Sequence, residues 1–219
     1  MRKTHPISLD QLDLYVANIK ACYYQALQYP SIADCGLSWH IEANSKAQRI
    51  AARHKVSLSL VCGAIAALSP GNKWERNLVD ADLLIKAHNL GNKLDSFKSA
   101  TYGHNKEKAW QIAKGFDPLD VLRGNKVRAF YECLLDPCNS YAVCVDSHAT
   151  NIALGKQATI AQTPTLTDQR YELMASAYRK ATQEINADSL ESPILPLQVQ
   201  AATWTLYRVL RGIDTSFTI

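Results

Sequence analysis

The sequence SLSLVCGAIAAL, residues 57–68, is almost entirely apolar, and the fold class depends on what this segment becomes. The run from Leu58 to Leu68 is the longest mainly apolar one in the chain, interrupted by Ser59 and Gly63. It is about half of the roughly 20 residues that a helix needs to cross a bilayer. We therefore expect a buried helix at the centre of a helical bundle, and no membrane span.

Helical periodicity continues on both sides of this segment. Apolar residues recur at helical spacing over 9–28, where Ser8 and Gln11 make a capping box, and again from Trp39 to Ala51 after a break at Pro30. Periodicity and end signals predict further helices over 74–89, 103–115 with Gly115 as the C′ residue, from Pro118 after an Asp117 N-cap, 125–135, 146–154, 166–186 and 196–211.

Strand-like alternation is nearly absent, and YAVCV at 141–145 is its nearest case. The expected fold class is therefore all-α. A length of 219 residues with 47% hydrophobic and 20% charged residues is ordinary globular composition, which excludes a disordered or low-complexity chain. The net charge is 24 − 20 = +4, which hints at an anionic partner without identifying one.

Two further features bear on the cellular compartment. No apolar segment follows the basic start MRK, so a secretory signal is not expected and the predicted location is the cytoplasm, at the nucleoid. No two of the six cysteines form a CxxC pair, which favours structural thiols over metal ligands or disulfides.

The residues with chemical potential concentrate in GNKVRAFYECLL, 124–135, and VCVDSHATNIALG, 143–155. Lys126 lies in the first turn of a predicted helix and precedes Asp146 by 20 residues (146 − 126). At such a helix start, unsatisfied backbone N–H groups favour an anion, so Lys126 is either solvated or held toward a ligand. The simplest role of Asp146 is that of an N-cap.

Together with two other blocks, these segments resemble the helix-hairpin-helix DNA glycosylase superfamily, which includes endonuclease III and 8-oxoguanine glycosylase. The blocks are ALSPGNKWERNLVDADLL, GHNKEKAWQI, GxKVxAF and VDxHxxxIA, in the family's order over about residues 57–155. The resemblance implies two helical lobes, one of residues 57–135 and one of 1–56 plus 136–219, with a DNA-binding cleft between them.

The resemblance also implies roles for individual residues. Asp146 would stabilise the oxocarbenium-like sugar, Lys126 would attack C1′ and form a Schiff base, and His148 would contact a phosphate or support the site. The residues implied to contact DNA are Arg123, Gly124, Asn125 and Arg128 in the hairpin, and Asn72, Lys73, Trp74 and Arg76 in the turn that enters the duplex. A flipped base would stack on aromatic side chains, for which the candidates are Tyr23, Tyr24, Trp39, His40, Trp204 and Tyr207. The alternative for these six is a core role.

Three departures from the family pattern are visible. The family hairpin LPGVGxK is LRGNK here, two residues shorter, which puts its phosphate-binding turn in doubt. Gly71 stands where the family carries Gln or Asn. For Arg76, the alternative to a DNA contact is the role of an ordinary surface arginine. The four-cysteine iron–sulfur motif is absent, so no metal and no cofactor is expected.

The expected function is excision of a damaged or modified base from double-stranded DNA by a monomer, with or without abasic-site lyase activity. Hypermodified phage bases are among the substrates that fit. The alternatives are an abasic-site lyase that does not excise bases, a noncatalytic helical DNA-binding protein, and an unrelated helical protein. The sequence does not identify the base.

Overall fold

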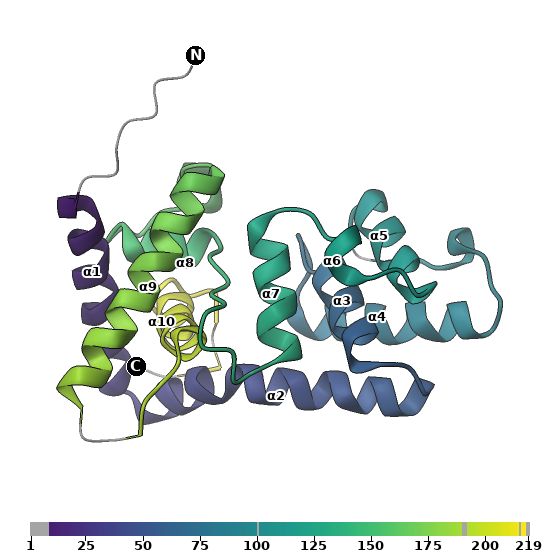
Figure 1. Ribbon diagram of the computed structural model, residues 1–219, viewed down its shortest axis with the longest axis horizontal. Coiled ribbons are helices and arrows are strands. Elements are labelled where there is room, and N and C mark those ends of the chain that lie inside the picture. The colour runs from purple at the N-terminus through teal and green to yellow at the C-terminus, as the bar shows by residue number, and fades with distance from the viewer. Residues whose placement is uncertain (1–8, 100, 190–191, 215, 218–219) are drawn as a thin grey trace, which may run out of the picture. The chain divides into compact units, whose positions relative to one another are not determined.

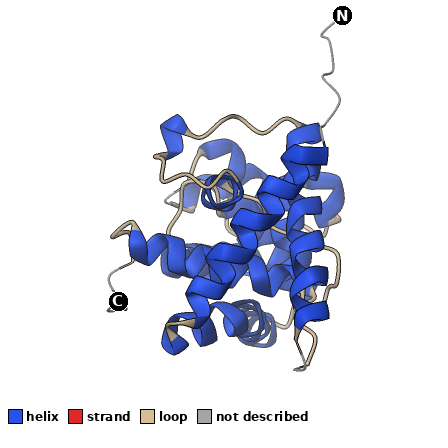
Figure 2. Cartoon of the chain, turned by 90° about the vertical axis from the view of Figure 1, so that its left-hand side faces the viewer, coloured by secondary structure: helices blue, strands red, loops and turns tan. Residues whose placement is uncertain are grey.

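The computed structural model describes residues 9–99, 101–189, 192–214 and 216–217, and within them the chain is helical with no strand (Figures 1 and 2). The α-helices are α1 (Leu9–Leu27), α2 (Pro30–His54), α3 (Leu58–Leu68), α4 (Trp74–Asn89), α5 (Gly103–Ala113), α6 (Pro118–Val121), α7 (Asn125–Leu135), α8 (Ser147–Ala153), α9 (Asp168–Asp188) and α10 (Pro196–Leu210). Two short 3-10 turns, η1 (Leu94–Ser96) and η2 (Ile160–Gln162), complete the elements. The all-α prediction is confirmed.

The local end signals explain where the helices begin and end. Asp117 caps α6 by accepting a hydrogen bond of 2.7 Å from the Leu119 amide, with Pro118 as the first helical residue. Gly115 and Gly155 follow their helices with φ of +98° and +63°, which favours glycine. Residues 142–146 are neither helix nor paired strand, and Ser8 of the predicted capping box lies outside the described residues.

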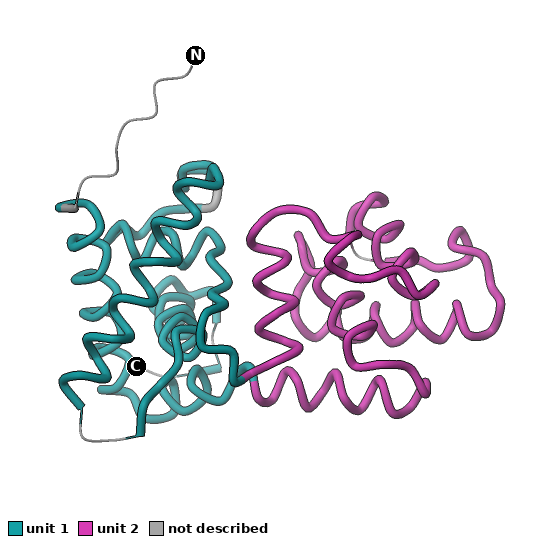
Figure 3. Tube along the Cα trace, in the orientation of Figure 1, with its two compact units in different colours: residues 1–40, 138–219 teal, residues 41–137 magenta. Residues whose placement is uncertain are grey.

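The chain divides into two compact units, shown in Figure 3. Unit 1 consists of residues 1–40 and 138–219, and unit 2 of residues 41–137. The first boundary lies at residue 40 rather than at the expected residue 56. One reason is Asn44, a buried side chain of α2 that donates to the carbonyl oxygens of Leu134 (2.7 Å) and Leu135 (3.2 Å) at the end of α7.

Unit 2 is built around α3. Every residue of this helix from Val61 to Leu68 is buried, and α3 packs against α4, α5, α6 and α7. At Gly63 a Cβ would lie 2.7 Å from Cγ of Pro118, so the close approach of α6 requires glycine there. The expected central helix is confirmed. Among the described residues no single helix could cross a membrane, and only α2 and α3 together, across a 117° bend, pass on length and composition.

Unit 1 is formed by α1, α8, α9, α10 and the first part of α2. Helix α1 packs against α8, α9 and α10, and α8 packs against α10. Ile19, Tyr178 and Leu206 are among its fully buried side chains. At Gly36 a Cβ would lie 2.4 Å from Cα of Ala202, so α2 approaches α10 at backbone distance. This close contact brings Trp39 and His40 of α2 toward residues of α10.

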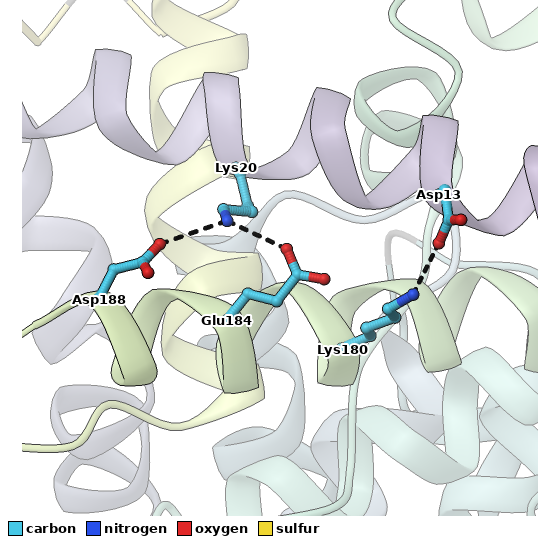
Figure 4. Close-up of polar contacts among 5 residues, drawn as sticks. All are labelled: Asp13, Lys20, Lys180, Glu184 and Asp188. Atoms are coloured by element: carbon cyan, nitrogen blue, oxygen red, sulfur yellow. Dashed lines mark hydrogen bonds and ion pairs between the residues drawn. The ribbon is translucent and has the colours of Figure 1, made fainter.

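Ion pairs join α1 to α9 on the surface of unit 1 (Figure 4). Lys20 lies 3.0 Å from Glu184 and 3.5 Å from Asp188, and Lys180 lies 2.6 Å from Asp13. The hydrogen bond that Lys20 donates to Glu184 is the main cause of the raised pKa of Lys20. Exposed pairs of this kind each contribute at most about 1 kcal/mol to stability. Because each of the two lysines is paired with a carboxylate of the other helix, we assign these residues a structural role.

Candidate functional site

Asp146 lies at the point where the extended segment 142–146 enters α8. Its backbone is extended (φ −98°, ψ −170°), and its Oδ1 accepts a hydrogen bond of 2.8 Å from the amide of Ala149. This is the geometry of an N-cap, as predicted. The Thr150 hydroxyl donates to the Asp146 carbonyl oxygen at 2.7 Å, so the cap is held from both sides.

The second carboxylate oxygen of Asp146 has a partner from a distant part of the chain. Nε1 of Trp204, on α10, donates to Oδ2 of Asp146 at 2.9 Å. An ionised carboxylate only accepts hydrogen bonds, and here each oxygen has a donor. The carboxylate is therefore fixed in orientation while the residue keeps partial exposure to solvent.

Tyr171 of α9 holds the segment that leads to Asp146. Its hydroxyl donates to the carbonyl oxygen of Val143 at 2.8 Å and accepts from the amide of Val145 at 3.3 Å. Both valines and the tyrosine are buried. One hydroxyl thus satisfies two backbone groups in a segment that has no sheet partner, and it fixes the path of the chain one residue before the carboxylate.

Four of the six aromatic residues proposed for a base pocket lie in one cluster with Asp146. The ring of Trp39 lies 4.9 Å from that of His40 and 6.5 Å from that of Trp204, all edge-on. His148 lies 6.2 Å from Trp204 and 5.4 Å from Tyr207. We call these five rings, with Asp146, the Asp146 cluster.

The other two candidates lie on α1. Tyr23 and Tyr24 contact each other edge-on at 5.8 Å, and Tyr23 is buried whereas Tyr24 is exposed. Tyr23 therefore has the core position that was the alternative for all six residues. The same burial applies to His40 and Tyr207, which are 3% and 5% exposed.

The ring of Trp204 is not a free surface for stacking, because both its face and its N–H have partners in the protein. The guanidinium carbon of Arg208 lies 4.4 Å from the centre of its ring, and its N–H is bonded to Asp146. Its observed contacts orient a carboxylate and support an arginine. The sequence suggested Trp204 as a candidate for a base pocket but indicated neither of these contacts, and it gave no role to Arg208.

Several polar atoms around the cluster are buried without a hydrogen-bond partner. They are both ring nitrogens of His40, Nδ1 of His148 and Nε of Arg208. Buried polar groups are normally satisfied by the protein, by water or by a ligand, so these four nitrogens call for a partner. Burial lowers the pKa of His40 to about 4, and burial is also the main cause of the lowered pKa of His148. Both rings are therefore neutral at pH 7.

The hairpin that carries Lys126 joins α6 to α7 in unit 2. Gly124 is the N-cap of α7 with φ +83° and no side-chain cap, and Lys126 lies in the first turn, half-buried beside Asn125. Arg128 donates to the carbonyl oxygens of Leu119 (2.8 Å) and Leu122 (3.0 Å). The shortened hairpin thus uses this arginine to satisfy the end of α6, while a DNA contact by Arg128 remains a prediction.

The other turn proposed to contact DNA, between α3 and α4, is organised by a residue that sequence reasoning missed. The side chain of Asp80 is fully buried, and it accepts from Arg76 Nε at 2.8 Å and from Asn72 Nδ2 at 3.1 Å. The i,i+4 spacing of Arg76 and Asp80 was the available signal. Lys73 is exposed just before α4, and Trp74 packs edge-on against Phe130 of α7 at 6.4 Å.

Lys126 belongs to unit 2, whereas Asp146 and the rings around it belong to unit 1. Among the described residues, no group of three His, Cys, Asp or Glu side chains is arranged to hold a metal ion. Cys22 and Cys62 are thiols whose pKa burial raises to about 12, as suits a small hydrophobic role.

Comparison with known proteins places the chain in a family without assigning it an activity. No curated protein and no solved structure matches the chain. A family model does match, over residues 1–211, which is nearly the whole length. The chain therefore belongs to DUF7178, a family of unknown function.

Proposed function

We propose that the protein is a DNA glycosylase that releases a damaged or modified base from double-stranded DNA. The observation that carries the proposal is the fixed carboxylate of Asp146, which is bonded to the Ala149 amide and the Trp204 indole among aromatic rings. As a base leaves, the sugar develops positive charge. A carboxylate that is oriented in advance lowers the energy of that state without reorganising.

The rings around Asp146 suit the other half of the reaction. A base inside the duplex is out of reach of an enzyme, so the nucleotide must be rotated out of the stack and held. The Asp146 cluster offers aromatic rings beside the carboxylate, and aromatic side chains are the groups on which an extruded base stacks.

Unit 2 supports the proposal through its turns. Gly124 begins α7 with a positive φ and no side-chain cap, and Lys73 is exposed at the start of α4. Helix N-termini and adjacent cations favour phosphate groups. Lys126 of the same hairpin is our candidate nucleophile for a lyase step, in which its amine bonds to C1′, the base leaves, and a Schiff base forms.

The test is a panel of duplexes that each carry one modified base, scored for abasic-site formation under single-turnover conditions. Wild-type protein should release at least one base, and Asp146→Asn should be slower by orders of magnitude. The matched control is Asp117→Asn, which changes an N-cap aspartate of α6 in unit 2. DNA binding without base release from any duplex would favour a noncatalytic role, and cleavage of abasic DNA alone would favour a lyase.

A further inference from the structure

The arginines of this protein differ in whether a carboxylate or a carbonyl oxygen lies against the guanidinium. Several are engaged by carboxylates or carbonyl oxygens: Arg53 with Asp82, Arg76 with Asp80, Arg179 with Glu172, and Arg128 with the end of α6. Arg208 and Arg211, in the last turn of α10 and at its end, form no ion pair with any described residue. Unit 1 therefore presents two uncompensated positive charges in one place.

These two charges lie beside His148 and Trp204. The Arg208 guanidinium lies over the Trp204 ring at 4.4 Å, and the His148 ring lies 6.2 Å from the same indole. Both Arg208 and Arg211 lower the pKa of His148, which shows that their charges reach its ring, while Asp146 acts in the opposite direction. Arg208 and His148 thus both lie beside the Trp204 ring, and Arg211 follows Arg208 by three residues, about one helical turn.

Two nitrogen atoms of these side chains lack a hydrogen-bond partner. Nε of Arg208 and Nδ1 of His148 are buried without a partner, and leaving such a group unpaired costs about 1–3 kcal/mol. A cation near a helix C-terminus is favourable because of the helix dipole. That effect accounts for positive charge at the end of α10, but it leaves the two nitrogens unexplained. An anion supplies several acceptor oxygens, which are the partners that unpaired N–H donors need.

We infer that Arg208, Arg211 and His148 form a phosphate-binding subsite beside Asp146. A guanidinium offers donors in a fixed fork that matches phosphate oxygens, and the neutral imidazole adds one N–H. The identification of the phosphate as part of a DNA backbone rests on the proposed function. Trp204 then has two tasks, since its N–H orients the carboxylate and its ring face positions the arginine.

The first experiment uses inorganic phosphate and no DNA. The Trp204 indole N–H and the His148 ring proton signals are followed by NMR during a phosphate titration of the full chain. We expect both signals to shift, with the shift reduced in Arg208→Gln and in Arg211→Gln. The matched control is Arg170→Gln, which removes an exposed arginine of α9 in the same unit. Arg208→Lys keeps the charge and should retain part of the response, which separates charge loss from disturbed packing.

The second experiment asks whether the phosphate belongs to DNA. Affinity for a duplex is measured over a range of salt concentrations, where each neutralised phosphate contributes about −0.9 to the slope of log K against log salt. Arg208→Gln/Arg211→Gln should flatten this slope by about one relative to wild type and Arg170→Gln.

The two experiments separate failure of the subsite from failure of the proposed function. Unshifted NMR signals together with an unchanged salt slope in the double variant would overturn the subsite and leave the glycosylase proposal standing. Phosphate-dependent shifts in a protein that binds no duplex would support the subsite and overturn the proposed function.

Discussion

Nε1 of Trp204 lies 2.9 Å from Oδ2 of Asp146, so one hydrogen bond joins residues 58 positions apart in the chain. It connects the cap of α8 with the middle of α10. Asp146 thus has a structural role through Oδ1 and an orientation imposed by another helix through Oδ2. The two roles can be separated by substitution, which makes this contact the most direct way to test the site.

Trp204→Phe keeps an aromatic ring and removes the N–H donor. Hydrogen bonds to charged groups contribute about 1.5–3 kcal/mol, so we expect base release to slow by roughly 10- to 100-fold if the bond orients Asp146 for catalysis. Single-turnover excision measures this, with circular dichroism to verify folding. A wild-type rate in the folded variant would mean that the indole serves only packing.

Asp146→Asn should cost stability as well as activity. The amide keeps one acceptor oxygen, so its NH2 group must face either the Ala149 amide or the Trp204 indole, and one donor loses its partner. We expect a loss of about 1–3 kcal/mol in the free energy of unfolding. Asp117→Asn should lower the free energy of unfolding much less, because that side chain caps a solvent-exposed helix start and Asn is as good an N-cap residue as Asp.

The double variant Asp146→Asn/Trp204→Phe completes a thermodynamic cycle. Because Phe has no N–H to oppose the amide, the double variant should be more stable than the sum of the single losses predicts. Urea denaturation of the four proteins supplies the coupling energy. Strict additivity would contradict a direct interaction between these two side chains.

Gly124→Ala tests the hairpin through its backbone alone. No atom lies within 4 Å of the position that a Cβ would take at Gly124, so the expected loss of about 1–3 kcal/mol comes from the φ of +83°. Gly103→Ala is the matched control, since that glycine opens α5 in the same unit with equally open surroundings and without the positive φ. There, alanine should be neutral or slightly stabilising. Equal effects would show that Gly124 is not constrained.

His40 predicts a loss of stability in acid. Above pH 6.5 the imidazole is neutral in both the folded and the unfolded chain, so folding releases no proton from it. As pH falls from 6.5 to about 4, the unfolded chain binds a proton that the folded protein does not, which lowers the free energy of unfolding by about 3 kcal/mol. His40→Leu should flatten this pH dependence relative to wild type, while substitution of the exposed His104 by Leu should leave it intact. The lowered pKa of His148 acts in the same direction.

Lys126→Gln tests the lyase step. If the amine attacks C1′, borohydride should reduce the imine and trap a protein–DNA adduct that the variant fails to form. Lys156→Gln, an exposed lysine of unit 1, controls for nonspecific amines. An undiminished adduct in Lys126→Gln would exclude this lysine. Base release with no adduct in wild type would instead indicate water as the nucleophile.

The helices were predictable because their signals are local. The bounds of α4 and α7 match the predicted 74–89 and 125–135, and the Asp117 and Asp146 caps lie where the sequence indicated. The boundary between the units was not predictable from such signals. It depends partly on Asn44, which bonds carbonyls 90 and 91 positions away.

The candidate site shows the same division. Asp146 and several of its aromatic neighbours could be identified as residue types, but the partners of their polar atoms could not. Arg76 was proposed to face DNA, and the structure pairs it with buried Asp80 one helical turn away. Arg208 was not proposed at all, because its position over Trp204 follows from the packing of α10 rather than from a motif.

The division of the chain has a consequence for how the protein is made. Unit 2 is one continuous stretch and is complete once residue 137 has left the ribosome, whereas unit 1 is assembled from segments on either side of unit 2. Domains generally fold as units during synthesis, so unit 2 can fold while unit 1 still lacks its last helices. Asp146 is translated before Trp204, and a nascent or truncated chain without α10 carries the carboxylate without the indole that orients it.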